Sequence, residues 1–160
     1  MLELKDLFFR KNTAQSLMNS ISANKLAHSY LFWGREGTGK LYTALSLAYT
    51  MKKLAGDTYA KKGFSDLSHP DINIIIPAKK DISDDQVKYR QLIDDLSKNP
   101  IVSPTLEGQP NIPISSVRNL IAWLRMPPTY PGGRFAIIHE AQMMKQEAAN
   151  AFLKTLEEPS

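Results

Sequence analysis

One segment restricts the possible folds of this chain more than any other: the loop GREGTGK at residues 34–40. It matches the pattern G-x-x-x-x-G-K, which carries structural meaning where it joins a strand to a helix. The preceding run SYLFW, residues 29–33, is aromatic and aliphatic and predicts a buried strand. From Leu41 onwards, apolar residues recur at helical spacing as far as Gly56, a residue type that readily ends a helix. The sequence thus predicts a strand, a glycine loop and a helix in succession.

The chemistry of this loop predicts an anion site. Glycines let backbone N–H groups turn inward, where they and the positive end of the following helix surround a phosphate. A lysine after the last glycine adds a mobile positive charge for the outer phosphates. The alternative is a tight turn that needs glycine only for its shape. The candidate phosphate-binding residues are Gly34, Gly37, Thr38, Gly39 and Lys40.

Two positions that would hold magnesium in an active nucleotide site carry unsuitable residues. Phosphoryl transfer uses a Ser or Thr hydroxyl after the lysine, and Leu41 has no lone pair to offer. The second contact is an aspartate at the end of a later strand, where FAIIHE places His139. A neutral imidazole is a poor ligand for a hard, oxygen-seeking ion. We therefore expect degenerate magnesium positions at Leu41 and His139 and no bound metal. No catalytic residue is expected, with Glu140 as a vestigial candidate whose alternative role is a solvated residue at a helix start.

The remaining elements alternate between helices and short apolar strands. Residues 72–76 and 135–138 are continuously apolar, which is typical of strands buried on both faces. Apolar spacing predicts four further helices, in the ranges 12–26, 83–99, 117–124 and 149–156. Ser83, with Gln86 three residues later, is the expected cap of the second of these helices. Polar or proline-rich composition predicts loops at 57–71 and 99–114. This alternation predicts an α/β fold with a mostly parallel sheet. Because open sheets usually have about four to six strands, three visible strands indicate an incomplete sheet.

The composition narrows the function classes. A chain of 160 residues makes about one domain, and its zero cysteines exclude disulfides, thiolate metal sites and a cysteine nucleophile. No apolar run approaches the roughly 18 residues that span a bilayer, and the start has no cleavable signal, so the expected location is cytoplasmic. The net charge of +4 is scattered along the chain, which tolerates nucleic acid without indicating it.

Several aromatic and charged side chains have a structural interpretation. Phe32 and Trp33 belong to the first expected strand and are interpreted as core. His28 and His69 have no paired ligand, so we interpret them as structural or solvent-facing rather than metal-binding. The arginines of the C-terminal third that could meet phosphate or a neighbouring subunit are not clustered and are interpreted as solvated surface: Arg118, Arg125 and Arg134.

Three blocks of the chain resemble the AAA+ clamp-loader subunits of bacterial replicative DNA polymerases. They are HSYLFWGREGTGK at 28–40, IPISSVRNLIAWLRMPPTYPGGRFAIIHEAQMM at 112–144 and EAANAFLKTLEEPS at 147–160. The third block is the most diagnostic, because other proteins with a glycine loop have no reason to carry NAFLKTLEEP after the corresponding strand. The resemblance implies a three-layer P-loop NTPase (AAA+) core with a mostly parallel sheet. It also implies that residues 1–160 are a nucleotide-binding-type domain, incomplete at its C-terminus and truncated before the sensor strand, with lid and collar domains absent.

Two branches of that family compete, the delta-prime type and the ATP-hydrolysing gamma/tau type. Gamma/tau-type chains would carry Thr or Ser at position 41, Asp at position 139 and a four-cysteine zinc module. This chain has Leu41, His139 and no cysteine, so it is more similar to the delta-prime type, a largely rigid, non-hydrolysing member of a five-subunit ring. An active AAA+ ATPase subunit of the gamma/tau type is the alternative.

The resemblance then implies a function within an assembly. The subunit would help to load the sliding clamp on primed DNA as part of the DNA polymerase III holoenzyme, with no ATPase activity of its own. Its partners would be the gamma/tau and delta subunits, and through the complex the sliding clamp and DNA, with no membrane contact. No cofactor would be required, weak binding of ATP, ADP or another anion is allowed, and zinc is not expected.

Overall fold

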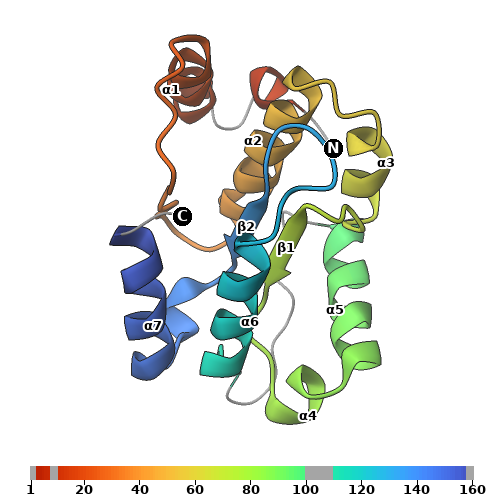
Figure 1. Cartoon of the computed structure of the whole chain (residues 1–160), viewed down its shortest axis with the longest axis vertical. Coiled ribbons are helices and arrows are strands. Elements are labelled where there is room, and N and C mark those ends of the chain that lie inside the picture. Colours follow the sequence, from red (N-terminus) through yellow and green to blue (C-terminus); the bar gives the residue numbers. More distant parts are fainter. Residues whose placement is uncertain (1–2, 8–10, 100–109, 158–160) are drawn as a thin grey trace.

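The computed structural model describes residues 3–7, 11–99 and 110–157 as a mixed α/β fold (Figure 1). In chain order the elements are η1 (Leu4–Asp6), α1 (Lys11–Ser22), α2 (Lys40–Leu54), α3 (Ala60–Ser65), β1 (Ile72–Ile75), α4 (Lys80–Ser83), α5 (Gln86–Lys98), α6 (Ile114–Leu124), β2 (Phe135–Ile138), η3 (Ala141–Met143) and α7 (Gln146–Glu157). Within these described ranges, no helix is both long and apolar enough to cross a membrane.

Strands β1 and β2 form a parallel pair in which Ile72 lies opposite Phe135. Two backbone hydrogen bonds close the ends of the ladder. The Phe135 N–H donates to the Asp71 carbonyl at 2.9 Å, and the His139 N–H donates to the Ile75 carbonyl at 2.8 Å. The first residue after β2 is thereby fixed to the end of β1.

Side chains of the two strands alternate between two helical layers. One core cluster joins the strands to α2 and α5: Leu41, Leu45, Leu67, Ile74, Ile76, Ile93, Leu96 and Ile137. A second joins the opposite face to α6 and α7: Ile75, Ile112, Val117, Leu120 and Ala148. Burial on both faces explains why the strand sequences are continuously apolar. The predicted α/β class and parallel pairing are confirmed, whereas two strands do not establish a three-layer P-loop core.

The predicted strand at 29–33 is wrong, because this segment forms no strand. Leu31 and Trp33 are 85% and 90% exposed, so the interpretation of Trp33 as a core residue is wrong as well. Phe32 is half-buried and packs with Leu47 in the cluster that covers the other side of α2. An apolar run becomes a strand only when a neighbour accepts its backbone hydrogen bonds, and among the described residues β2 pairs with β1 alone.

The start of α5 also differs from the prediction. The helix begins at Gln86, and its cap is Asp85, whose carboxylate accepts the N–H groups of Val87 and Lys88 at 3.0 and 3.2 Å. Ser83 instead ends the short helix α4, where its hydroxyl donates to the carbonyl three residues earlier. Aspartate caps a helix as well as serine does, so the nearer residue takes the position.

The expected loop at 57–71 contains the helix α3, which the prediction missed. Asp57 starts it by accepting the N–H groups of Tyr59 and Ala60 at 2.8 and 3.0 Å. The expected loop at 99–114 lies largely outside the described residues.

A buried ammonium group joins α2 to Asp71, the residue before β1, and to the loop that precedes β2. The Lys52 side chain is fully buried, and its Nζ lies 2.7 Å from Asp71 Oδ2. The same Nζ donates to the carbonyls of Tyr130 and Pro131 at 3.2 and 3.1 Å. All three of its N–H groups therefore have acceptors, which is the condition for burying such a charge.

His69 connects this ammonium group to α3. Its Nε2 lies 2.9 Å from Asp57 Oδ2, and its Nδ1 accepts the Asp71 N–H at 3.1 Å. Because Nδ1 is an acceptor, the proton lies on Nε2 and points at Asp57. A Cβ on Gly63 would lie 2.8 Å from the His69 Cβ, so only glycine fits against the ring. The structural interpretation of His69 is confirmed.

The Asp71 carboxylate is the second centre of the cluster. Burial by itself would raise its pKa, but hydrogen bonds from Lys52 and from the N–H groups of Thr129 and Tyr130 outweigh burial and hold the pKa below its usual value. Asp71 is thus an anion that two separate segments of the chain stabilise, helix α2 and the loop at Thr129 and Tyr130.

We predict that Lys52→Met lowers the free energy of unfolding by about 3–5 kcal/mol, because it leaves a buried carboxylate without its cation. Lys53→Met is the matched control, since that neighbouring ammonium is half-exposed and, within the described ranges, pairs with Glu3 alone. Denaturant unfolding of both variants at pH 7 measures the difference. A loss that is the same for the two variants would contradict the structural role of Lys52.

Candidate functional site

The glycine loop precedes α2 directly, as the sequence predicts. Gly37 and Gly39 have φ angles of 70° and 73°, in the left-handed region, and Gly39 occupies the position before the first helical residue, Lys40. A Cβ on Gly37 would meet no atom within 4 Å, so glycine is needed there for its conformation and not for space. The first N–H groups of a 15-residue helix therefore open toward the loop.

The loop is closed on itself by its own lysine. Lys40 Nζ donates to the carbonyls of Gly34 and Arg35 at 3.1 and 2.9 Å. The Thr38 hydroxyl donates to the same Arg35 carbonyl at 2.7 Å. These contacts bring four of the loop residues together around one ammonium group. An anion that enters the loop competes with two backbone carbonyls for Lys40.

His139 follows β2 and is 7% exposed. Its Nε2 has no hydrogen-bond partner among the described residues and lies 3.7 Å from a Glu140 carboxylate oxygen. Burial lowers the pKa of this imidazole, the Glu140 carboxylate opposes the shift, and the Lys40 ammonium reinforces it. The ring therefore lies within electrostatic range of the glycine loop and is neutral at pH 7.

Glu140 adopts a left-handed backbone conformation, with φ of 50°, as the chain turns from β2 into η3. Its carboxylate accepts a hydrogen bond from the Gln142 side-chain amide. The sequence analysis gave Glu140 as a vestigial catalytic candidate or a solvated residue at a helix start, and the structure places it at the turn before η3. The turn itself was not predicted, because non-glycine residues seldom take this conformation.

Leu41 lies in the first turn of α2 and is buried in the core. It is 6% exposed and belongs to the cluster formed by α2, α5 and the strands. Among the described residues no three His, Cys, Asp or Glu side chains form a group that could hold a metal ion. Leu41 presents an alkyl group and His139 a neutral imidazole, so neither side chain offers the oxygen ligand that a hard cation prefers.

Two residues that the sequence left as surface or isolated have specific partners. Arg134 stacks on Trp123, with its guanidinium carbon 4.5 Å from the ring centroid, and donates to the Trp123 and Pro127 carbonyls at 2.8–3.1 Å. Its interpretation as solvated surface is wrong, while Arg118 and Arg125 are exposed as expected. Exposed His28 contacts the Leu156 carbonyl through Nε2 at 2.9 Å.

The buried cluster around Lys52 is the main feature that sequence reasoning missed. A signal was present in the fragment HPD at 69–71, where a histidine and an aspartate flank a proline directly before an apolar strand. A lysine inside an otherwise apolar helix was the second signal. Neither indicates its partner, because Lys52 and Asp71 are separated by 19 positions and by a helix.

Comparison with known proteins places this α/β domain in the class of bacterial DNA polymerase III subunits of the clamp-loader family. The family model described as "DNA polymerase III, delta subunit" matches residues 9–160. The chain belongs to this family, and the resemblance drawn from the three sequence blocks is confirmed.

Relatives from both predicted branches match the chain. The delta-prime subunit of DNA polymerase III from Bacillus subtilis is 30% identical over 150 residues, which cover 90% of this chain and 36% of the relative. The tau subunits from Salmonella typhimurium and Escherichia coli are each 25% identical over 154 residues, which cover 96% of this chain and 20% of the relative. The chain thus spans about a third or less of the length of these relatives. No solved structure gives a significant match.

We predict that His139 makes the protein less stable below neutral pH. The folded-state pKa of the imidazole lies below its ordinary value, so the unfolded chain binds the proton first and stability falls as pH drops through about 6.5. One such proton changes the free energy of unfolding by at most about 1.4 kcal/mol per pH unit.

The comparison to make is denaturant unfolding at pH 7.5 and pH 5.5 for the parent, His139→Gln and the exposed-histidine control His28→Gln. We expect His139→Gln to lose less stability than the other two proteins over this interval. Equal losses in all three would mean that the His139 pKa is not depressed by folding.

Proposed function

We propose that this chain is a delta-prime-type clamp-loader subunit whose nucleotide site has lost its magnesium ligands. Membership of the DNA polymerase III family carries the general role. The loss of magnesium ligands is inferred from two residues. Leu41 is a buried leucine and His139 a buried, neutral histidine, and these are the two positions where magnesium would be held.

The proposed role is to help load the sliding clamp on primed DNA within the cytoplasmic DNA polymerase III assembly. Gamma/tau and delta subunits are the proposed direct partners, and the clamp and DNA are reached through the complex. The names of the relatives support this assignment, since each is a subunit of DNA polymerase III. Co-purification of the protein in its full natural length with gamma/tau and delta subunits tests it, and failure to retain either subunit would contradict it.

The glycine loop retains features that suit an anion without metal. Its helix N-terminus and Lys40 remain, and charge-assisted hydrogen bonds are each worth about 1.5–3 kcal/mol before desolvation and entropy. Binding requires Lys40 to leave the Gly34 and Arg35 carbonyls, which accept from it at an exposed site. We therefore propose weak binding of ATP, ADP or phosphate and no requirement for a cofactor or zinc.

An active ATPase subunit of the gamma/tau type is the second candidate. The two tau relatives cover 96% of this chain, and the loop keeps both glycine pattern and lysine. This function needs a magnesium ligand other than Leu41 and His139, such as the Thr38 hydroxyl reached through a rearranged loop. Turnover measurements separate the two candidates.

We predict no magnesium-dependent ATP turnover by the 160-residue chain above the background of a Lys40→Ala control. The physical reason is that neither magnesium position presents an oxygen ligand, so the phosphates are not held for attack. Phosphate release measured with and without EDTA checks the expectation. Release that both EDTA and Lys40→Ala abolish would favour the gamma/tau-type alternative.

We further predict that Leu41→Thr combined with His139→Asp tightens nucleotide binding only when magnesium is present. The double change restores one hydroxyl and one carboxylate, the ligands that magnesium prefers. Titration with a fluorescent ATP analogue in magnesium and in EDTA measures the gain. Hydrolysis is expected to remain low.

The matched control for the double variant is Leu45→Thr with His139→Asp, which removes a similar leucine from the same core without placing a hydroxyl next to the loop. It should lose stability and gain no magnesium dependence. Unchanged affinity in the Leu41 variant would mean that these two residues do not occupy the magnesium positions.

A further inference from the structure

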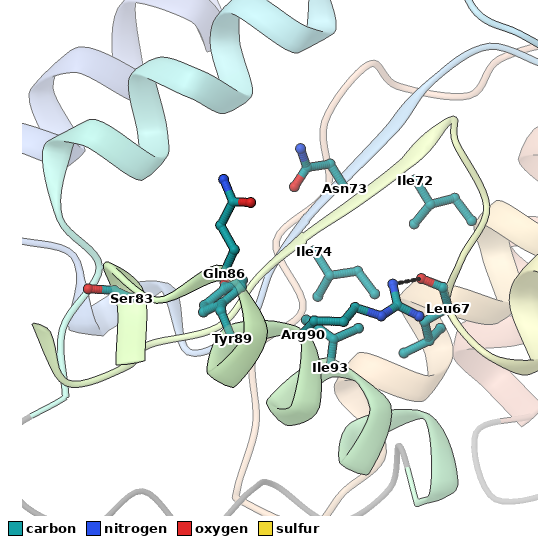
Figure 2. A pocket seen from close by; sticks show the side chains of 9 residues that line it. All are labelled: Leu67, Ile72, Asn73, Ile74, Ser83, Gln86, Tyr89, Arg90 and Ile93. Atoms are coloured by element: carbon teal, nitrogen blue, oxygen red, sulfur yellow. Dashed lines mark hydrogen bonds between the residues drawn. The ribbon is translucent and has the colours of Figure 1, made fainter. Parts of the chain in front are cut away.

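A groove of about 330 Å³ runs between β1 and helix α5 (Figure 2). The residues that line it come from β1, α5 and the segments before them: Leu67, Ile72, Asn73, Ile74, Ser83, Gln86, Tyr89, Arg90 and Ile93. None of them belongs to the glycine loop or to the end of β2. The groove is therefore a separate feature of the molecule.

Unpaired backbone groups of β1 lie along this groove. Backbone groups of successive residues point to opposite edges of a strand. The carbonyls of Asp71 and Ile75 accept from β2, so the N–H and C=O groups of Ile72 and Ile74 point to the outer edge. The Ile72 N–H donates to the His69 carbonyl at 3.1 Å. The Ile72 carbonyl and both backbone groups of Ile74 have no partner among the residues that the structure describes.

Tyr89 closes the edge at its other end. Its hydroxyl accepts the Ile76 N–H at 2.9 Å and lies 3.3 Å from the Ile76 carbonyl. The open part of the edge is thus three groups long, in the order C=O of Ile72, then N–H and C=O of Ile74. An edge of this length can pair with a short extended segment, and it leaves no free backbone groups with which a longer strand could continue the ladder.

Side-chain amides flank the open edge. Figure 2 shows Gln86 and Asn73 pointing to the same open side of the groove, and in the described part of the chain neither amide has a hydrogen-bond partner. Each offers a donor and an acceptor, the pair that a peptide unit matches. Arg90 is the one lining residue that carries a full charge. Its guanidinium lies 2.8 Å from an Asp94 carboxylate oxygen and donates to the carbonyls of Asp66 and Leu67 at 3.1 and 3.4 Å.

We propose that this groove binds a short extended peptide segment as an added edge strand, with an acidic side chain beside Arg90. Three residues in extended conformation present N–H, C=O and N–H to one side, which complements the three open groups of β1 in either strand direction. The alternative ligand is a planar heterocycle such as the base of adenosine. It would pair with only one donor and one acceptor of this edge, so it complements the three open groups less fully.

The rest of the lining agrees with a peptide of this kind. Leu67, Ile74 and Ile93 offer an apolar surface for a central apolar side chain. No carboxylate is among the lining residues, and although Asp94 pairs with Arg90 from outside the groove, the guanidinium turns N–H donors toward the groove and so favours an acidic residue over a basic one. The spare N–H groups of its guanidinium remain available, because its contacts use only part of its five donors.

The test uses the whole 160-residue chain labelled with ¹⁵N and the capped peptide acetyl-Glu-Val-Thr-Val-Glu-amide as the probe. We expect a saturable shift of the Ile74 amide resonance, with affinity in the millimolar range, about that of a few hydrogen bonds. The same peptide N-methylated at its three internal residues keeps the apolar side chains and loses the donors, so it should give no such shift. The peptide with Lys in place of both Glu should bind about threefold more weakly.

Matched variants locate the contact. Gln86→Ala should weaken binding by about threefold, and Gln146→Ala, which removes the same side chain from the first position of α7, should leave it unchanged. Equal shifts from the N-methylated peptide would overturn the proposal, as would adenosine shifting the Ile74 amide when the peptide does not. An Ile74 resonance that does not move at about 10 mM peptide would overturn it too.

Discussion

The fold depends on a single buried cation. Lys52 Nζ and Asp71 Oδ2 lie 2.7 Å apart with neither side chain exposed, and an ammonium group in that position is tolerated only if every N–H finds an acceptor. The acceptors come from the residue before β1 and from the loop before β2, so the position of α2 relative to both is set by hydrogen-bond geometry. Apolar packing alone would allow the helix to slide by a fraction of a turn. The hydrogen bonds of Lys52 therefore fix where α2 lies along the sheet, while the apolar core supplies most of the buried surface.

The same helix connects this cluster to the glycine loop. Lys52 and Lys40 lie 12 positions apart on α2, about 18 Å along a straight helix. Lys52 is buried and all three of its N–H groups have acceptors. Lys40 is partly exposed and donates to two carbonyls of its own loop. The two ends thus contrast a buried ammonium group with three acceptors and a partly exposed one that bonds to its own loop. His139 is fixed by the hydrogen bond from its backbone N–H to the Ile75 carbonyl, and its ring is buried. The candidate site thus combines the partly exposed ammonium group of Lys40 with the buried, neutral ring of His139.

Local patterns in the sequence were sufficient for most helices and for two strands. Apolar spacing located α1, α2, α5, α6 and α7, and continuous apolar runs located β1 and β2, because these signals arise from burial of one stripe or of both faces. The segment 29–33 has the same apolar character and forms no strand, since pairing depends on a neighbour and not on the segment itself. The position of the glycine loop could be derived from its motif. The partners of Lys52, Asp57 and His69 could not, because contacts between distant charged residues have no periodic signature.

The closed ends of the β1 edge also limit how this edge can pair with strands of other chains. A free strand edge is a template on which other chains pair, and long exposed edges promote aggregation. Here a tyrosine hydroxyl occupies the edge at Ile76 and the His69 carbonyl occupies it at Ile72, so an incoming strand finds room for only one repeat of the ladder. Stacking of successive chains into a fibril requires an edge that continues in register over several residues. A single phenol group on α5 thereby limits how far any pairing at this edge can grow.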